Sequence, residues 1–316
     1  MLQIEDYKHA YIQDVVACWN SSLIYDPITE ERFLQQIELD ENFDPSLALV
    51  AVKDGKVIGF SLGLRRKYPY LTRGLEPDRG WISVFFVHPQ YREKGCGEIL
   101  LNETEHRLAA DGAKNITLCA YSPNYFAPGI NILYDTGVRF FEKHGYPRGE
   151  EEYSMARELY SYTIPSDTIE HAADLQKKGI VFTMYEDKYK DSLLDLTERE
   201  FGAGWTLNVL HALQKREAEQ TIVLAVKNYS VIGYCMRKID GNDGRFGPIG
   251  VSEKYRDYGI GGVLLDMQMR EMQKRCIYSF YCLWTGGDAA RFYTRHGLSA
   301  VKTFYMYRKE LKYGKL

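Results

Sequence analysis

The sequence predicts a mixed α/β (α+β) fold that occurs twice in a chain of 316 residues. The first observation is that strand-like and helix-like segments alternate along the chain. The second is that a hairpin pattern repeats: residues 50–53 match 224–227, and residues 57–60 match 231–234. A single domain usually takes ~100–200 residues, so the length accommodates two copies.

A glycine-rich turn between a strand and a helix is the third observation, and it also occurs in both halves. The turns are residues 87–97 and 251–261, and each contains the pattern Arg-x-x-Gly-x-Gly. Glycines let successive backbone N–H groups turn towards one point, and the helix N-terminus adds a partial positive charge. The turns therefore predict two sites for an anion, most often a phosphate. Two such turns in register are a much stronger signal than one alone.

The elements of the first half begin with two amphipathic helices. Asp54 and Gly55 form a hairpin turn signal between the two strands that follow. We expect, in order, helices at 14–21 and 29–39, strands at 47–53, 56–64 and 81–87, a helix at 98–110, a strand at 115–121, a short helix near 140–145 and a closing strand at 151–164.

The second half repeats this order after a short connection. Pro165 and Ser166 interrupt the chain, and Gly179 suits the C-cap of the next helix. We expect a helix at 167–178, a strand at 180–185, helices at 187–201 and 206–218, the repeated hairpin, a strand ending at 251, a helix from 263, a strand at 279–284, a short helix near 292–297 and a strand at 301–309. The first half carries extra residues within 65–80 and 122–137.

Composition excludes several classes of protein. The formal net charge of −3 gives no support for broad nucleic-acid binding. The longest apolar runs are far too short to span a bilayer, and residues 1–6 lack the features of a signal peptide. The six cysteines show no Cys-x-x-Cys pair and no metal-like spacing with histidine. We therefore expect a cytoplasmic protein with reduced thiols, no bound metal, no nucleic-acid partner and no membrane partner.

Each half resembles the GNAT superfamily of acyl-CoA-dependent N-acetyltransferases. The two glycine turns and the stretch Phe292-Tyr293-x-x-His296-Gly297 carry this resemblance, which covers nearly the whole chain. It implies two tandem GNAT domains, 1–165 and 166–316, each a mixed, mostly antiparallel sheet flanked by helices. Residues 123–129, 247–251 and 284–287 are similar to tandem-GNAT proteins of bacteria, and among these to the clostridial glucosamine/glucosaminide N-acetyltransferases.

The resemblance implies acetyl-CoA as the cofactor, with its pyrophosphate on the glycine turns. The matching residues of the second half are Val251, Arg256, Asp257, Tyr258, Gly259, Ile260 and Gly261. Their counterparts in the first half are Val87, Arg92, Glu93, Lys94, Gly95, Cys96 and Gly97. The two valines end the strands that are expected to pair with the pantetheine arm.

Attack of an amine on a thioester makes three physical demands. The amine must lose a proton, the oxyanion needs a donor such as a backbone N–H, and the departing thiolate benefits from an acid. Tyr293 occupies the place of the family's acid, although an aromatic ring packed on the sheet is the alternative. The first half has Phe141 there, which has no proton to donate. We therefore expect the second half to be the catalyst and the first to bind coenzyme A weakly, differently or not at all.

Two further residues are candidates for the acceptor side of the site. Asp288 could hold the incoming ammonium and accept its proton, or it could be the N-cap of the following helix. Trp284, at a strand end, could stack on a sugar ring, or it could be a core residue.

The expected function is transfer of an acetyl group from acetyl-CoA to a primary amine of a small molecule, with an amino sugar as the best guess. Alternative acceptors are a polyamine, an aminoglycoside, an amino acid or a protein N-terminus. A different class is a coenzyme-A-binding regulatory or scaffold protein without turnover. The expected assembly is a monomer with pseudo-dimeric halves, or a homodimer.

Overall fold

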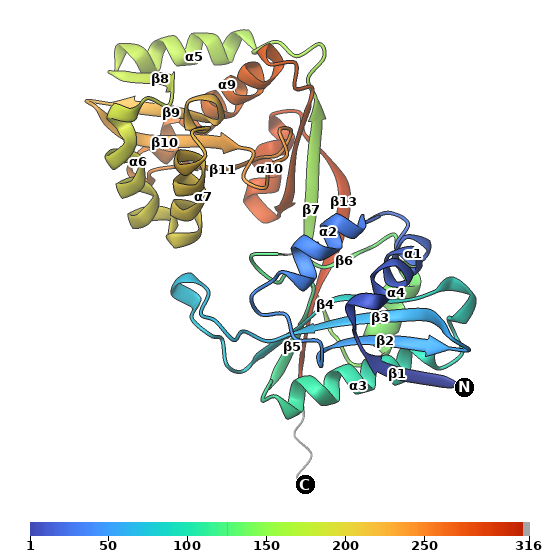
Figure 1. Cartoon of the computed structure of the whole chain (residues 1–316). Coiled ribbons are helices and arrows are strands. Elements are labelled where there is room, and N and C mark those ends of the chain that lie inside the picture. Colours follow the sequence, from blue (N-terminus) through green and yellow to red (C-terminus); the bar gives the residue numbers. More distant parts are fainter. Residues whose placement is uncertain (125, 312–316) are drawn as a thin grey trace. The chain divides into compact units, whose positions relative to one another are not determined.

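The computed structural model describes residues 1–124 and 126–311 (Figure 1). The chain divides into two compact units: Met1–Glu152 together with Thr303–Leu316, and Tyr153–Lys302. Tyr125, which lies in the compared stretch 123–129, falls outside the described residues. Within them, no helix is both long enough and apolar enough to cross a membrane.

The first unit is built on a sheet with the strand order β1-β2-β3-β4-β5-β13. Neighbouring strands are antiparallel except β4 and β5, which are parallel. Its elements are β1 (Leu2–Asp6), α1 (Ile12–Ser22), α2 (Glu30–Phe33), a π-helical turn (Leu34–Glu38), β2 (Ala48–Lys53), β3 (Lys56–Leu64), β4 (Arg79–Val87), α3 (Cys96–Ala110), β5 (Asn115–Leu118), β6 (Ile130–Asn131) and α4 (Asp135–Lys143). Two further strands, β7 (Arg148–Glu158) and β13 (Ser299–Glu310), have residues in both units.

Helices cover both faces of this sheet because alternate strand residues point to opposite sides. On one face, Trp19 of α1 and Phe33 of α2 pack with Phe60 and Phe86. On the other face, Leu100 of α3 packs with alternate residues of β2 and β3.

The second unit contains a four-stranded antiparallel sheet with the order β11-β10-β9-β8. Its elements are α5 (Ser166–Lys177), β8 (Ile180–Met184), α6 (Lys190–Leu196), a π-helical turn (Thr197–Phe201), α7 (Ala203–Gln214), α8 (Ala218–Thr221), β9 (Ile222–Lys227), β10 (Ser230–Arg237), β11 (Phe246–Val251), a 3₁₀ segment (Glu253–Tyr258), α9 (Ile260–Lys274), β12 (Ser279–Thr285) and α10 (Gly287–Arg295). One core joins α5 and α9 to the sheet, and a second core joins α6 and α7 to its other face. Both units therefore have the predicted architecture, a mostly antiparallel sheet between helices.

The compact units do not coincide with the predicted domains 1–165 and 166–316. The C-terminal strand β13 pairs with β5 in the first unit, where Arg308 lies opposite Thr117. In the second unit, β12 pairs with the end of β7, where Ser279 lies opposite Glu158. Each unit thus uses a closing strand from the other half of the sequence. A repeat predicts that a closing strand exists, but ladder hydrogen bonds are the same for either partner edge, so it does not predict which edge the strand joins.

Two predicted helices begin earlier than their sequence pattern indicated. The helix expected from 263 begins at Ile260, and the one expected from 98 begins at Cys96. Gly97 and Gly261 consequently lie in the first helical turn instead of the loop. Their missing side chains allow close packing, because a Cβ on Gly97 would lie 3.3 Å from the ring of Phe140.

Candidate functional site

The glycine turn of the second unit has the geometry of an anion site. The chain leaves β11 at Val251, makes a 3₁₀ segment and reaches Gly259, whose φ of 70° is in the left-handed region that glycine adopts without strain. Helix α9 begins at the next residue, and Ile260, which is fully buried, anchors it. The first N–H groups of a helix have no partner within it and attract negative charge, so this turn fits a phosphate.

Two basic side chains, Arg256 and His171, lie at the same turn. Arg256 is exposed, and no hydrogen bond or ion pair of its guanidinium is found within the described residues. His171 of α5 lies against the turn, with its Nε2 atom 2.8 Å from the backbone oxygen of Tyr258. Asp257 and Tyr258 are exposed on the 3₁₀ segment.

Strand β11 has an open edge beside this turn. On one side it pairs with β10, from Gly233 opposite Val251 to Arg237 opposite Phe246. On the other side, the only bridge to β12 in the described part of the chain joins Arg245 to Tyr281, before β11 begins. Residues 247–251 are half-exposed. Their backbone groups on the open edge can therefore hydrogen-bond an extended, amide-containing chain such as pantetheine.

Tyr293 lies on α10 with its ring packed edge-on against Phe246, at 5.2 Å between ring centroids. Its hydroxyl has no hydrogen-bond partner among the residues that the structure describes. Burial raises the pKa of Tyr293 far above the ordinary value of 10.0, and the nearby Cys282 and Cys235 add to the shift. The phenol therefore stays protonated at neutral pH, as a proton donor must.

The corresponding region of the first unit is closed. Phe141 is only 6% exposed, and its ring packs edge-on against Phe85 at 5.3 Å. The guanidinium of Arg92 is engaged, since its Nε donates to the backbone oxygen of Val87 (2.9 Å) and its Nη2 donates to that of Ser22 (3.0 Å). The first unit therefore keeps the loop but lacks both the unpartnered phenol and the unpaired arginine found among the described residues of the second unit.

The remaining residues of the first glycine turn keep the backbone shape of an anion site. Gly95 has φ of 79° and caps α3, and Glu93 also has a positive φ of 59°. Lys94 donates to the backbone oxygen of Gln90 at 2.8 Å. Cys96 is buried and packs in the core with Val87 and Leu100.

Asp288 is not the N-cap that the sequence offered as its alternative role. The N-cap of α10 is Gly286, and Asp288 lies in the first turn with a side chain that is 91% exposed. Its carboxylate forms an ion pair with Arg291. Five residues separate it from Tyr293, which places the two about 140° apart around the helix. The role of Asp288 in catalysis stays a prediction, and the structure does not bring its side chain together with the tyrosine. Trp284, the other candidate, is 38% exposed on β12.

Sequence reasoning missed three aromatic residues and a carboxylate next to β11. Glu200, in the π-helical turn that follows α6, accepts hydrogen bonds from the Ser252 hydroxyl and the Glu253 N–H, both at 2.8 Å. This tether holds Phe201 and Trp205, whose rings stack at 4.7 Å and lie on Gly250. Tyr234 of β10 completes the group. The available signal was the repeat itself, because Tyr234 and Gly250 correspond to Phe60 and Phe86.

A buried carboxylate ties α9 to α10. Asp266 is 1% exposed, accepts hydrogen bonds from the hydroxyls of Tyr162 (3.0 Å) and Thr168 (2.8 Å), and lies 3.4 Å from Nδ1 of His296. His296 is the C-cap of the helix that carries Tyr293. The matching residue of Asp266 in the first half is Asn102, so only the second unit has this tie.

We expect Asp266→Ala to lower the free energy of unfolding by about 3 kcal/mol, because it leaves the buried hydroxyl of Tyr162 and the partly buried hydroxyl of Thr168 without their acceptor. Urea denaturation measures the change. The exposed Asp257→Ala variant serves as the control and should differ from the wild type by less than ~0.5 kcal/mol. Equal stability of the two variants would show that the network contributes nothing.

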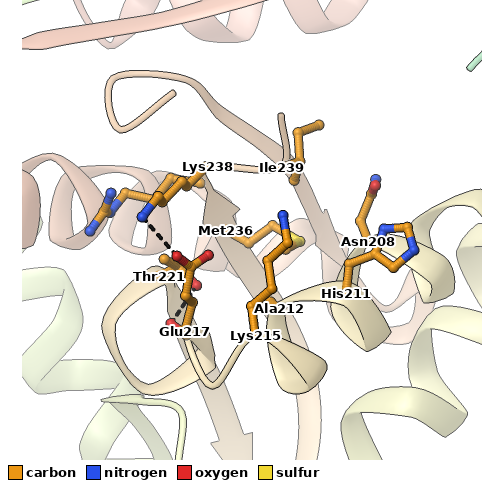
Figure 2. Close-up of a pocket in the computed structure, with 10 residues that line it drawn as sticks. Asn208, His211, Ala212, Lys215, Glu217, Thr221, Met236, Lys238 and Ile239 are labelled. Carbon is orange, nitrogen blue, oxygen red and sulfur yellow. Dashed lines mark hydrogen bonds and ion pairs between the residues drawn. The ribbon is translucent and has the colours of Figure 1, made fainter. Parts of the chain in front are cut away.

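A small hollow lies on the α7 side of the second unit's sheet (Figure 2). Its lining includes Lys215 and His211 from α7 and Lys238 from the end of β10. Lys238 donates to Glu217 at 2.8 Å, as Figure 2 shows, so its charge is offset, whereas Lys215 has no ion pair among the described residues. Among the described residues, no group of His, Cys, Asp and Glu suits a metal ion.

Comparison with known proteins assigns a family. The family model described as Acetyltransferase (GNAT) family matches residues 7–146 and again 190–298. Acetyltransferase SG1711 of Sodalis glossinidius (strain morsitans) is 28% identical over 123 residues, which cover 39% of this chain and 78% of that protein.

Solved structures share the fold over the whole chain. One is described as a GCN5-related glucosamine N-acetyltransferase region of a fungal multi-domain GH3 β-N-acetylglucosaminidase (TM-score 0.78, 19% identity). The match covers 98% of this chain but only 38% of that one. A tandem GNAT protein from the clavulanic acid biosynthesis pathway matches 100% of both chains, with a TM-score of 0.64 and 13% identity. At these identities the likeness concerns the fold alone.

Proposed function

Because this chain belongs to the acetyltransferase (GNAT) family, we propose that it transfers an acetyl group from acetyl-CoA to a primary amine of a small molecule, and that its second unit is the catalyst. One observation carries the choice of unit: Tyr293 presents a protonated, unpartnered hydroxyl beside β11, whereas its counterpart Phe141 is buried and has no proton to donate.

The residues of the second unit fit acetyl-CoA, which supplies the acetyl group as an activated thioester. The turn at Gly259 and the N-terminus of α9 would hold the pyrophosphate, with Arg256 adding positive charge and His171 holding the turn through its contact with Tyr258. The open edge of β11 would hold the amide-containing arm, and a free N–H on that edge would stabilise the oxyanion. Tyr293 would donate its proton to the departing thiolate.

For the acceptor we propose an amino sugar. The structural neighbour named as a glucosamine N-acetyltransferase region motivates the choice, although its similarity extends only to the fold. The basic groups around the α7 hollow disfavour polycationic acceptors such as polyamines and aminoglycosides, because like charges repel. A polar ring with one amine is compatible with this charge.

The first unit favours a second function. With Phe141 in place of the acid and Arg92 bonded to backbone oxygens, we propose that this unit binds coenzyme A without turnover or serves as a scaffold.

A thiol-release assay with acetyl-CoA tests the proposal directly. The panel contains glucosamine, a polyamine, an aminoglycoside, an amino acid and a peptide with a free N-terminus. We expect amine-dependent thiol release, fastest with glucosamine. Binding of coenzyme A without thiol release for any amine would instead identify a scaffold protein.

Substitution of the turn glycines separates the two units. A Cβ on Gly259 would lie 2.7 Å from Nε2 of His171, whereas a Cβ on Gly95 would meet nothing within 4 Å. Both alanines carry a similar backbone strain, of about 1 kcal/mol. We expect Gly259→Ala to weaken coenzyme A binding about tenfold or more and Gly95→Ala to leave turnover unchanged. Calorimetric titration with coenzyme A measures the binding, and the thiol-release assay measures the turnover. Equal losses of turnover in the two variants would argue against the second unit as the catalyst.

A further inference from the structure

In the second unit, α6 and α7 cover one face of β10 and β11. The residues on this face differ sharply from those on the matching face of β3 and β4 in the first unit. In the first unit, Phe60 and Phe86 occupy this face, with ring centroids 6.0 Å apart and both side chains buried. In the second unit the matching residues are Tyr234 and Gly250, which lie directly opposite each other on the two strands. One half therefore fills the space with apolar rings, and the other places a hydroxyl beside a residue without a side chain.

Gly250 is required for the arrangement of the neighbouring rings. A Cβ at this position would lie 2.6 Å from Phe201 and 2.8 Å from Trp205. The two rings stack on each other with an interplanar angle of 26°, and both remain half-exposed. A stacked aromatic pair of this kind, next to the final residue of the cofactor strand, offers an apolar face to a ligand.

Tyr234 adds a polar group that the protein itself does not use. Its side chain is fully buried, and its hydroxyl has no hydrogen-bond partner in the described part of the chain. Its ring lies 6.1 Å from each of the two stacked rings. A buried hydroxyl without a partner is costly, whereas the phenylalanine of the first half avoids that cost. A ligand that displaces part of the half-exposed ring pair would reach this hydroxyl and supply its missing hydrogen-bond partner.

The two faces of β11 suit the two groups that would act on the thioester, the acid on one face and the amine on the other. Val251 and Ile249 pack with the core that contains Tyr293, whereas Gly250 points to the opposite face, towards Trp205. An amine held on the α7 face would approach the thioester from the side opposite the acid. The Glu200 tether to Ser252 and Glu253 keeps the stacked rings next to the turn.

We propose that Trp205, Phe201 and Tyr234 form the acceptor subsite of the second unit, and that it binds a hydroxylated six-membered ring with a single amine, such as 2-amino-2-deoxyglucose. The inference rests on the proposed acetyltransferase function. The apolar face of the sugar ring would pack on Trp205, and a ring hydroxyl would hydrogen-bond to Tyr234. Lys215, at the C-cap of α7, has no ion pair among the described residues, and its charge would act against a second positive charge on the acceptor (Figure 2).

The test uses the full chain and two variants with matched controls. Trp205→Leu removes the aromatic face, and its control is Leu210→Ala on the exposed side of the same helix. Tyr234→Phe removes only the hydroxyl, and its control is Tyr229→Phe, which is 82% exposed in the adjoining hairpin. For each protein, KM is measured for glucosamine at saturating acetyl-CoA and for acetyl-CoA at saturating glucosamine. Calorimetry measures the Kd of glucosamine for the enzyme loaded with coenzyme A.

We expect Trp205→Leu to raise both the KM and the Kd of glucosamine about tenfold and Tyr234→Phe to raise them about fivefold, with the KM of acetyl-CoA unchanged. Tyr234→Phe should not lower the unfolding midpoint, since no protein hydrogen bond is lost. An unchanged unfolding midpoint would show that weaker binding of glucosamine does not come from damage to the fold.

The outcomes separate the subsite from the function. Wild-type turnover with unchanged glucosamine constants in both variants would overturn the subsite and leave the acetyltransferase function intact. Faster acetylation of spermidine than of glucosamine would overturn the proposed ligand class. Glucosamine binding that depends on Trp205, without turnover of any amine, would overturn the function and retain the subsite. If the wild type neither binds glucosamine nor turns over any amine, both the subsite and the acetyltransferase function are overturned.

Discussion

Tyr293→Phe is expected to lower kcat by at least about 100-fold, since general acid catalysis contributes typically 10²- to 10⁴-fold. The substitution removes one hydroxyl that has no hydrogen-bond partner in the described residues, so the ring packing against Phe246 and the folded state should be retained. Steady-state kinetics measure the loss, and thermal unfolding shows whether the fold is unchanged. Tyr278→Phe, whose ring stacks on Tyr160, is the matched control and should keep wild-type turnover.

The pH dependence provides a second check on the same residue. A phenol donates a proton only below its pKa, and burial raises the pKa of Tyr293 above the ordinary value of 10.0. The loss of the donor therefore shifts to higher pH, and no decline of activity between about pH 6 and pH 9 should come from this residue. An alkaline decline in that range that disappears in Tyr293→Phe would contradict the raised pKa.

Separate expression of residues 1–165 and 166–316 is expected to yield two fragments that do not fold cooperatively on their own. The first fragment lacks β13, whose Tyr307 is 1% exposed in the core of the first unit and donates to Glu142. It also loses Lys309, which pairs with Glu105 at 2.7 Å. Loss of a buried aromatic alone costs about 3–5 kcal/mol, a large part of the ~5–15 kcal/mol that stabilises a domain.

Circular dichroism and urea titration of each fragment would measure this effect. The control is an equimolar mixture of the two fragments, in which we expect a cooperative transition to return because both closing strands are again present. A peptide of residues 299–311 should partly stabilise fragment 1–165. Cooperative unfolding of fragment 1–165 alone, at the midpoint of the intact chain, would show that β13 is dispensable.

The local content of the fold could be predicted from the sequence, because it is determined by short-range patterns. The hairpin β9–β10 follows from two short apolar runs that repeat those of the first half, and the glycine turn at Gly259 requires the positive φ that its sequence indicates. The difference between Tyr293 and Phe141 is likewise visible in the sequence as soon as the repeats are aligned, and it remains the main argument for the catalytic unit.

The acceptor side of the site could not be predicted in this way. Asp288 was a candidate N-cap or base. In the structure Gly286 caps the helix and the carboxylate of Asp288 is exposed. The sequence pattern does not fix the residue at which a helix starts, and that residue decides which one is the N-cap. Trp284 was the aromatic candidate, whereas Trp205 comes from a helix whose own pattern says nothing about its contact with Gly250.

The sequence by itself determined the mixed α/β class, the twofold repeat, the two glycine turns and the contrast between Tyr293 and Phe141, since each depends on residues close together in the chain. Only the tertiary structure decided which closing strand completes each unit, which carboxylate ties α9 to α10 and which rings lie over Gly250. Those features arise from contacts between segments far apart in the sequence, and such contacts depend on packing and burial that no local pattern encodes.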